Sequence, residues 1–553
     1  MLSKISLVAV LYSASLLAET NYGTINTLTN GFGTVNECTN ETPHAVSNCP
    51  TDIAPDLSQI LDLATTNQCV SSYDEFRKAG IKVPKCPKDQ DSIKGLDNTH
   101  PSGGIFALYN GINDSFIANL AQGYLAGNNV SKFNLVIPKS KIKYLKSNPE
   151  LVKLLNNSRV NIVQLDTMPS VDRWMQDSFQ FTTINGKPAL YQLEHGYEQD
   201  MDLSERLACK IAKNCDIPYY IPPDMVDPNN ADKNSLNSGG NLEVLPGGTF
   251  YRGIIKTEGY SSPNLPDGKT IPFMTNAQKS QKAALEKDGN HVLDLDTTFL
   301  HVGHVDEIIN IVKTNKKAPC DFAVMIASPK KAFEIMERNA KSIENEKRQG
   351  RIINNIIDMF ITRVNAGAVS LKDATEEKKD ACREVSYDNL DATYSEKIIT
   401  PKDIKDIYSR NCINYSSVGK FVTSDEYAIL KRQNLDSSER KSIADIMEDN
   451  KASIISELKK TTKCSNPPIV EIPVFFRNGL SYTPDLVNGV VQTPPNGASQ
   501  VVLPRSYFKP FDSYVENELG KLGVKTTFAH DMGYHLQQGE VHCGSNSARI
   551  CKP

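Results

Sequence analysis

The chain contains 553 residues, of which 39% are hydrophobic and 23% carry charge, and its formal net charge is −4. Such a balance excludes a disordered or fibrous chain. Because there is no basic excess, the composition gives no support to nucleic-acid binding. The length accommodates roughly two to four average domains, or one large domain with insertions.

The N-terminal segment 1–18 has the pattern of a secretory signal peptide. Lys4 precedes an apolar run from Ile5 to Leu17, and Ala18 is a small residue at the expected cleavage point. The run is too short for a spanning helix, which needs roughly 20 residues, and no other stretch approaches that length. We therefore expect a secreted protein without a transmembrane segment, with an uncleaved N-terminal strand as the alternative.

Two further features agree with export. Asn-x-Ser/Thr tripeptides, the acceptors of N-linked glycans, suggest a glycoprotein and begin at Asn40, Asn113, Asn129, Asn156 and Asn414. The 12 cysteines are too sparse for a disulfide-built fold, but they are compatible with several bridges in an oxidising compartment. If Cys543 is a free thiol, at least one other cysteine is also unpaired, because an odd number remains.

Residues 19–104 are polar and rich in turns, which predicts an N-terminal extension that disulfides can pin. From residue 105 onward the pattern becomes mixed α/β. Short apolar runs at residues 133–137, 161–165 and 322–326 predict buried strands, with helical segments between them.

The segment 329–463 is the most helical and most charged part of the chain. Ser328 followed by Pro329 predicts the start of its first helix, since a serine cap precedes a proline at the first helical position. Apolar residues with helical spacing form two stripes within it: Ile353, Ile356, Ile357 and Phe360, and then Met447, Ile454 and Leu458. Such stripes indicate helices packing on a core rather than a surface for a partner or cofactor.

Strands return after Pro467. The pattern predicts strands at 469–476, 490–491 and 501–503, a helix near 514–522 and a strand at 524–528. This strand–helix–strand pattern leads directly into residues 539–546, which read Gly-Glu-Val-His-Cys-Gly-Ser-Asn. Cys543 therefore lies on a glycine-flanked loop, where a thiol is accessible, and is a candidate nucleophile.

Two upstream segments carry the other groups that a thiolate enzyme needs. Residues 172–177 read Asp-Arg-Trp-Met-Gln-Asp and precede an alternating run, so Asp177 is expected at a strand edge facing a cleft. Residues 302–307 read Val-Gly-His-Val-Asp-Glu, and in extended structure His304 and Asp306 would point to the same side. Burying such a pair at the start of an apolar strand costs free energy unless a charged group pairs with it.

The residue types favour chemistry on a guanidinium group. Two carboxylates can hold the planar cation flat by paired hydrogen bonds, and Trp174 offers an apolar wall for a cationic ligand. A thiolate then attacks the central carbon, while a histidine protonates the departing ammonia. Zinc on His301 and His304, or on His304 with His542 and Cys543, is a weaker alternative, because neither Cys-x-x-Cys nor His-x-x-x-His occurs.

These three segments, together with Gly-Asn-Leu-Glu-Val at residues 240–244, resemble the protein-arginine deiminases and occur in that family's order. Residues 473–491 also resemble a stretch of the family, and the similarity covers about residues 125–553. The resemblance implies an α/β pentein fold, a five-bladed propeller of ββαβ modules around a central site. The catalytic domain would span residues 105–553, with 329–463 as a helix-rich insertion.

The resemblance also implies roles for individual residues. The expected roles are Cys543 as nucleophile, His304 as general acid and base, Asp177 and Asp306 as guanidinium-binding carboxylates, Trp174 as the wall beside the substrate stem, and Arg206 as the grip on the substrate backbone. The implied reaction hydrolyses the guanidinium of arginine-containing proteins or peptides to citrulline and ammonia, through a cysteine thiouronium and without an organic cofactor.

The chain departs from the family where calcium is bound. Gln176 and Glu243 persist as candidate calcium ligands, with Asp202 or Glu205 as further candidates, but Ser178 and Gln180 stand where the family has glutamates. Because much of the negative charge is lost, we expect calcium binding to be weaker, altered or absent. Gln537 replaces an arginine before the nucleophile loop, which weakens the expected recognition of a peptide backbone.

Two alternatives remain beside a secreted protein-arginine deiminase. One is a pentein deiminase that acts on free arginine or agmatine, since those relatives also use a cysteine, a histidine and two carboxylates. The other is a catalytically inactive secreted binding protein on the same fold, which the altered calcium set favours. None of the four reactive residues is missing, which argues for an enzyme.

Overall fold

The computed structural model describes the following ranges of the chain: 69–80, 93–111, 113–127, 130–145, 149–165, 173–184, 187–193, 206–220, 238–255, 276–315, 319–348, 424–438, 441–494, 496–506, 508–529, 531–535 and 538–551. The expected signal segment 1–18, the apolar stripe at 353–360 and Gln537 lie outside these ranges, as do the glycan acceptors Asn40, Asn129 and Asn414.

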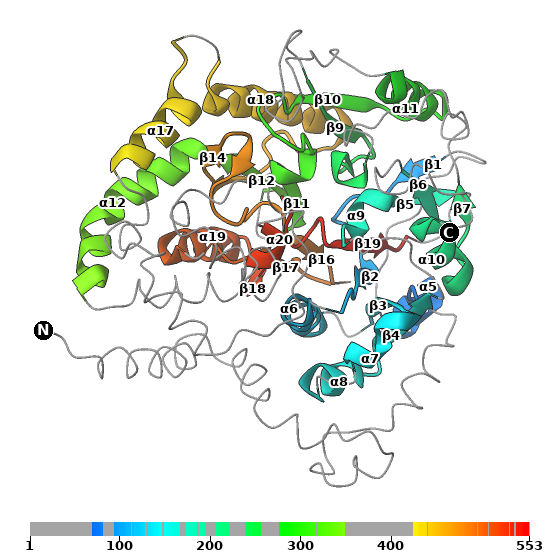
Figure 1. The fold of residues 1–553 in the computed structure, drawn as a ribbon. Helices are drawn as coiled ribbons and strands as arrows, with labels where there is room; N and C mark the ends of the chain where they lie inside the picture. Colours follow the sequence, from blue (N-terminus) through cyan, green and yellow to red (C-terminus); the bar gives the residue numbers. More distant parts are fainter. Residues whose placement is uncertain are drawn as a thin grey trace, which may run out of the picture.

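Within these ranges the strands form six sheets, and five of the six share one connectivity. Two antiparallel strands are followed by a helical connection and by a third strand that pairs parallel to the second. This is the expected ββαβ order. Figure 1 shows these sheets around the middle of the molecule, with helices such as α8, α10, α12 and α18 on the outside.

The first two repeats precede residue 300. One contains β5 (Phe179–Ile184), β6 (Lys187–Gln192), α10 (Leu207–Cys215) and β7 (Tyr219–Tyr220), and β1 (Ile93–Gly95) pairs with β5. The next contains β8 (Leu242–Val244), β9 (Phe250–Ile254), α11 (Asn276–Lys287) and β10 (Val292–Asp296).

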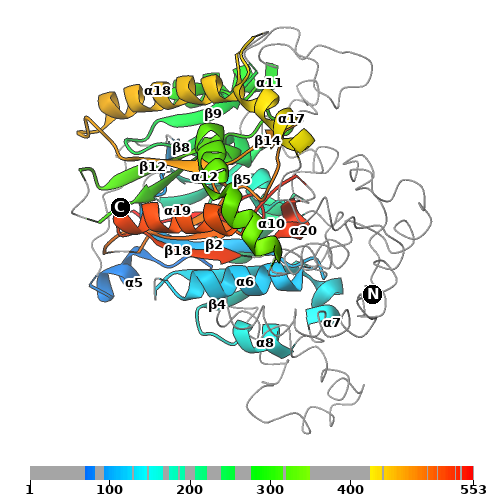
Figure 2. The ribbon, with the colours of Figure 1, turned by 90° about the vertical axis from the view of Figure 1, so that its left-hand side faces the viewer.

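The next two repeats contain the long helices. The third contains β11 (Ile309–Lys313), β12 (Phe322–Ser328), the helices α12 (Pro329–Arg348), α17 (Ser424–Leu435) and α18 (Ile443–Thr461), and then β13 (Ile469–Pro473). The fourth contains β16 (Val490–Gln492), β17 (Gln500–Pro504), α19 (Lys509–Lys521) and β18 (Lys525–Ala529). Figure 2 shows α6, α18 and α19 in side view.

The fifth repeat joins the two ends of the described chain. Its strands and helices are β19 (Ser545–Arg549), β2 (Ser102–Leu108), α6 (Asp114–Leu125), β3 (Lys132–Pro138), α7 (Ile142–Leu145), α8 (Pro149–Leu155) and β4 (Val160–Leu165). β19 pairs antiparallel with β2, so the last described strand completes the sheet that one of the first begins. β1 and the start of β2 precede residue 105, so residues expected in the extension contribute to two sheets.

Shorter elements connect these repeats and carry much of the candidate site. They are α5 (Tyr73–Lys78), η3 (Lys139–Lys141), α9 (Met175–Ser178), η8 (Gly239–Asn241), η10 (Val305–Glu307), the strand pair β14 (Phe476–Arg477) and β15 (Leu480–Ser481), and α20 (Met532–His535).

The strongest apolar patterns are confirmed as elements. β3, β4 and β12 cover the runs predicted at 133–137, 161–165 and 322–326, and all seven residues of β12 are buried. A strand covered on both faces needs such a continuous apolar run. The helix start at Pro329 is also confirmed, because Ser328 Oγ accepts a hydrogen bond from Lys331 N at 3.2 Å.

The second predicted stripe is confirmed on α18. Met447, Ile454 and Leu458 are at most 3% exposed and belong to the largest apolar cluster, which also takes in β11, β12, β13, β17 and α19. A second cluster lies between α6, α8 and the strands β2 to β4. Among the described residues, no helix has both the length and the apolar character that a membrane span requires.

Disulfides tie distant segments together. Cys69 pairs with Cys215 on α10, which links the N-terminal segment to the first repeat, and Cys320 pairs with Cys464 at the base of the helix-rich insertion. Cys209 and Cys543 are free thiols. The expectation that a second cysteine accompanies Cys543 as an unpaired thiol is confirmed.

The expected glycan acceptor Asn113 is contradicted by its surroundings. It is 7% exposed, and its amide nitrogen donates to Leu108 O and to Tyr534 Oη, both at 2.8 Å. A glycosylated nitrogen cannot keep both hydrogen bonds or remain buried, so a glycan at Asn113 would disrupt the fold. Asn156, in contrast, lies in an exposed turn after α8.

Candidate active site

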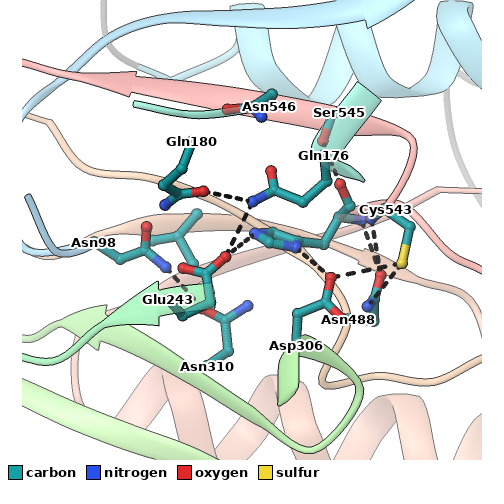
Figure 3. A network of polar contacts seen from close by, with 12 residues as sticks. Asn98, Gln176, Gln180, Glu243, Asp306, Asn310, Asn488, Cys543, Ser545 and Asn546 are labelled. Atoms are coloured by element: carbon teal, nitrogen blue, oxygen red, sulfur yellow. Dashed lines mark hydrogen bonds and ion pairs between the residues drawn. The ribbon is translucent and has the colours of Figure 1, made fainter. Parts of the chain in front are cut away.

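Polar side chains gather where the first strands of the repeated sheets begin. Asp177 lies in α9 just before β5, Glu243 lies on β8, and Asp306 lies in η10 just before β11. Asn488 and Cys543 precede β16 and β19. Each repeat therefore contributes one segment to the same region, which Figure 3 shows from close by.

Gly240 marks the point where three of the expected site residues meet. A β-carbon on this glycine would lie 2.5 Å from His304 Nδ1 and 3.2 Å from a carboxylate oxygen of both Asp177 and Asp306. His304 Nδ1 is 3.6 Å from Asp177 Oδ1. The three side chains belong to residues that are 2–9% exposed. The absence of a side chain at Gly240 lets this imidazole and these two acids approach the backbone of η8 closely.

Asp306 connects this group to the candidate nucleophile. Its Oδ2 lies 3.5 Å from Cys543 Sγ, close enough to accept a hydrogen bond from the thiol. Asn488 Nδ2 donates to the same sulfur at 3.3 Å. In Figure 3, Asp306 points toward Cys543, and Asn488 lies beside the sulfur. The structure thus brings all four expected reactive residues into one buried cluster.

The electrostatic surroundings favour the neutral thiol. Burial raises the pKa of Cys543 well above its usual value, and the charges of Asp306 and Asp177 act in the same direction. A cation held between these carboxylates would offset their charge and favour the thiolate. The arrangement is therefore suited to a positively charged ligand.

His542 bridges two buried carboxylates behind the nucleophile. Its Nδ1 lies 2.8 Å from Asp306 Oδ2, and its Nε2 lies 3.6 Å from Glu243 Oε1. Burial lowers the pKa of His542, but the hydrogen bond to Asp306 and the charge of Glu243 outweigh burial, so the pKa is raised. Burial also raises the pKa of Glu243 to about 7, against the opposing effect of His542.

The loop that carries His304 is a turn and not the extended structure expected from the sequence. His304 caps η10, and Asp306 lies within it. Glu307 Oε1 accepts a hydrogen bond from His304 N at 3.2 Å, and Asn241 Oδ1 accepts one from Val305 N at 3.1 Å. These bonds hold the backbone in a helical turn before β11 begins. The apolar pattern of β11 does not predict this turn.

Trp174 lies beside the cysteine loop, as expected of a wall at the site. A β-carbon on Gly539 would come within 2.4 Å of its ring, so glycine is required for this close approach. The indole also packs edge-on against Tyr534, with ring centroids 5.5 Å apart. Trp174 is only partly buried, so part of its ring remains accessible to a ligand.

Comparison with known proteins identifies the family. The family model described as protein-arginine deiminase (PAD) matches residues 130–407 and 413–552, which is most of the chain. The chain belongs to the protein-arginine deiminase family. The match includes each of the reactive residues singled out above: Asp177, His304, Asp306 and Cys543.

The curated deiminases that match are distant. Human protein-arginine deiminase type-1 is 22% identical over 402 residues, and mouse protein-arginine deiminase type-4 is 22% identical over 404 residues. Each alignment covers 68% of this chain and 46% of the relative, so the chain spans about half the length of the curated relatives it matches. A substrate-bound agmatine deiminase from C. jejuni aligns with 83% of this chain and 97% of its own, at 10% identity and a TM-score of 0.40.

The candidate calcium ligands of this chain do not fit a calcium ion. Gln176 Nε2 donates to Gln180 Oε1 at 3.0 Å and to Glu243 Oε1 at 3.1 Å. An amide donor and a ring nitrogen of His542 therefore face the carboxylate oxygen that a cation would need. Calcium takes six to eight oxygen ligands, and no group of three or more His, Cys, Asp and Glu suited to a metal occurs among the described residues.

The orientation of the Gln176 amide follows from its neighbours. A flipped amide would point its oxygen at two acceptor oxygens, so the nitrogen must face them. In Figure 3 the Gln176 side chain extends between Gln180 and Glu243. Ser178, the other position where the family has a glutamate, is fully buried. Hydrogen bonds thus take the place of metal coordination at this position.

The structure does not bring Arg206 into the network around Cys543. Arg206 caps α10 and is 7% exposed, but no hydrogen bond or ion pair of the described site residues includes it. Its expected role in gripping a substrate backbone stays a prediction. Gln537 lies outside the described residues, between α20 and the cysteine loop.

Sequence reasoning left several residues of the site without a role. His542 entered only as a candidate zinc ligand. Gly240 and Asn488 entered only as members of segments that resemble the deiminase family. Asn488 had a local signal, because an asparagine followed by Gly489 at the end of an apolar run is typical of a turn. The bridging position of His542 had no such signal, since both of its partners lie more than 200 residues away.

Proposed function

We propose that the protein is a secreted protein-arginine deiminase, a hydrolase that converts peptidyl-arginine to peptidyl-citrulline and ammonia. The single observation that carries the proposal is the convergence of Cys543, Asp306, Asp177 and His304 in one buried cluster beside Gly240. Membership in the deiminase family supports the same reaction. The alternatives are hydrolysis of free arginine or agmatine, and binding without catalysis.

The first half of the reaction uses the two acids, the thiol and the imidazole. Asp177 and Asp306 hold the guanidinium flat by paired hydrogen bonds. The arriving cation offsets the charges that raise the pKa of Cys543, and the thiol passes its proton to His304. Sγ then attacks the central carbon, one carbon–nitrogen bond breaks, and His304 supplies the proton with which ammonia departs. The product is a thiouronium on Cys543.

The second half uses a water molecule and the same histidine. His304, now neutral, takes a proton from the water as the oxygen bonds to the central carbon. The carbon–sulfur bond then breaks, the electron pair returns to the sulfur, and the sulfur takes a proton back from His304. The second proton of the water leaves with the ammonia as ammonium. The water supplies the oxygen of citrulline. Trp174 flanks the apolar stem of the substrate in this proposal, and Arg206 grips its backbone.

The proposal includes a reaction without calcium. The Gln176 amide and the ring of His542 already satisfy Glu243, so the active arrangement needs no metal ion to neutralise that acid. Secretion is also part of the proposal, and it rests on the signal-like segment 1–18. A closed five-bladed propeller remains our expectation for the fold, supported by the repeated ββαβ connectivity.

Ammonia release tests the function directly. Purified protein is given three substrates of equal concentration: a peptide with one internal arginine, free arginine, and agmatine. We expect ammonia and citrulline from the peptide at the highest kcat/KM. Cys543→Ser is the matched control, because it changes one atom of the nucleophile and should abolish turnover.

Each outcome has a defined meaning. Faster turnover of agmatine or free arginine would replace the peptide-directed proposal with its closest alternative. Absence of ammonia from all three substrates, with and without calcium, would contradict the proposed enzyme activity. It would favour a binding protein without catalysis.

A further inference from the structure

Asn488 is bound to the cysteine loop by every polar atom of its side chain. Its Oδ1 accepts hydrogen bonds from the backbone N–H of His542 at 3.1 Å and of Cys543 at 3.2 Å. Its Nδ2 donates to Cys543 Sγ at 3.3 Å. The residue is fully buried, with 0% exposure. The loop and the sulfur are therefore held by one planar group.

The two backbone contacts determine which way the amide faces. An N–H donor can only be met by an acceptor, so the oxygen of Asn488 must face the backbone and its nitrogen must face the sulfur. Rotation of the amide by half a turn would point its N–H groups at the backbone N–H groups of His542 and Cys543. The hydrogen bond to the sulfur is thus a consequence of the loop anchor.

The backbone around Asn488 is held from its other side by a second asparagine. Asn310 on β11 donates to the carbonyls of Val487 at 3.1 Å and of Gly489 at 2.7 Å, which flank Asn488 in the chain. Asn98 in turn donates to Asn310 Oδ1 at 3.0 Å. Figure 3 shows Asn98, Asn310 and Asn488 following one another toward Cys543.

The turn that presents Asn488 is also tied to the cysteine loop. Asp485 Oδ1 accepts a hydrogen bond from Val487 N at 2.9 Å, and the carbonyl of Asp485 accepts one from Asn488 N at 3.0 Å. Glu540 Oε1 accepts a hydrogen bond from Asp485 N at 3.1 Å. The donor and the thiol are therefore parts of one rigid unit.

We propose that Asn488 is a catalytic residue that stabilises the Cys543 thiolate by donating a hydrogen bond to its sulfur. Two carboxylates and burial oppose negative charge at this sulfur, whereas the amide of Asn488 offers it a fixed donor. This donor remains in place when the thiol proton leaves, so it favours the charged form. The inference rests on the proposed role of Cys543 as nucleophile.

Two substitutions separate the donor from the anchor. Asn488→Asp keeps an oxygen for the two backbone N–H groups but removes the N–H that faces the sulfur. Asn488→Ala removes both. We expect both variants to lose about 10- to 100-fold in kcat with little change in KM, since a hydrogen bond to a charged group has about this value. Only Asn488→Ala should also lower the Tm strongly.

The rate of Cys543 alkylation by iodoacetamide at fixed pH provides a readout that does not depend on turnover. It is followed at the Cys543 peptide by mass spectrometry, because Cys209 is also a free thiol. We expect at least a tenfold slower alkylation in both variants. This measurement stays informative even if the wild type hydrolyses no guanidino substrate, so failure of the function and failure of the inference are distinguishable.

Asn434 offers the matched control. It is likewise fully buried, donates to the carbonyls of Leu430 and Phe476, and accepts from Phe476 N, far from the cysteine loop. Asn434→Asp and Asn434→Ala should lower the Tm but leave alkylation and kcat within twofold. Alkylation and kcat of Asn488→Asp within twofold of wild type would overturn the inference, as would equal losses in the Asn434 variants.

Discussion

At the scale of single residues, the site places a thiol, two aspartates and two imidazoles within a few ångströms of one another. Asp306 connects two of these groups, since its Oδ2 faces both His542 and Cys543. It has two opposing effects in the proposed reaction. It would attract a guanidinium, and its charge raises the pKa of Cys543.

Asp306→Asn should separate these two effects. Loss of the negative charge lowers the pKa of Cys543, so the thiolate fraction and the alkylation rate at neutral pH should rise in the free protein. Turnover should fall by at least about 100-fold, because an anchor for the cationic substrate is lost. Parallel loss of both rates would show that Asp306 does not repel the thiolate.

The free wild type should show the corresponding pH dependence. Because the pKa of Cys543 is raised, the thiol is protonated at neutral pH, and its alkylation should accelerate steadily as the pH rises into the alkaline range. A rate that levels off near pH 7 would contradict the raised pKa. Mass mapping of the Cys543 peptide again separates this thiol from Cys209.

Gly240→Ala should disturb the arrangement of the acids and the imidazole. The new methyl group would lie 2.5 Å from His304 Nδ1, so the imidazole must move. We expect kcat/KM to fall by at least about 100-fold, on the scale of losing one major transition-state contact.

Gly520→Ala is the matched control for this substitution. Gly520 lies on α19, and a β-carbon there meets nothing within 4 Å. Alanine should therefore stabilise the helix by about 0.5–1 kcal/mol without changing turnover. Equal activity of Gly240→Ala and wild type would show that turnover does not depend on the close packing of His304 against Gly240.

At the scale of elements, the turns before the strands matter more for the site than the strands themselves. α9, η8 and η10 are each three or four residues long, and side chains from other repeats form hydrogen bonds with α9 and η10. Asn241 Oδ1, for example, accepts hydrogen bonds from Gly253 N and Val305 N. Such turns have little stability of their own and depend on their neighbours.

The Cys69–Cys215 bridge should stabilise the first repeat. It closes a loop with a sequence separation of 146 residues, and loss of a disulfide typically costs about 2–5 kcal/mol. Cys69→Ala combined with Cys215→Ala should therefore lower the Tm clearly in a thermal melt. Cys209→Ala, which removes a free thiol from the same helix, should change the free energy of unfolding by less than about 1 kcal/mol. A similar Tm for both variants would contradict a stabilising bridge.

At the scale of the whole molecule, five repeats of one connectivity bring distant segments to a common region. The β19–β2 pairing joins residue 545 to residue 107, and the contact of Asp306 with Cys543 spans 237 residues. The hydrogen bond of Gln176 to Glu243 and that of Asn488 to Cys543 each join segments that belong to different sheets.

Calcium removal should leave the activity largely unchanged. Because Gln176 and His542 satisfy Glu243, we expect rates in excess EGTA and in millimolar calcium to agree within about twofold, since no metal ligand set has to be completed. Gln180→Glu is the informative variant. Its added charge near Glu243 should lower the Tm in EGTA, and calcium should raise it again. Activation of the wild type by more than tenfold on adding calcium would contradict this expectation.

The sequence alone determined the elements whose signals are local. The apolar runs of β3, β4 and β12 and the stripe on α18 are confirmed, because burial on a fixed period is written into neighbouring residues. The candidate nucleophile, histidine and acids were also recognised from short segments whose order matches the deiminase family. The extended structure expected at His304 and Asp306 was wrong. The turn found there is held in part by Asn241, which lies more than 60 residues away in the chain.

Only the tertiary structure decided how these groups act on one another. The bridge from Glu243 through His542 to Asp306, the replacement of calcium coordination by the Gln176 amide, and the donor that Asn488 directs at Cys543 each join residues from different sheets. No local pattern encodes such contacts, because the distance between two side chains in different repeats depends on how all five repeats pack. The sequence determined which reactive side chains are present. The packing of the sheets decided how close these side chains lie to one another and how they affect one another's charge.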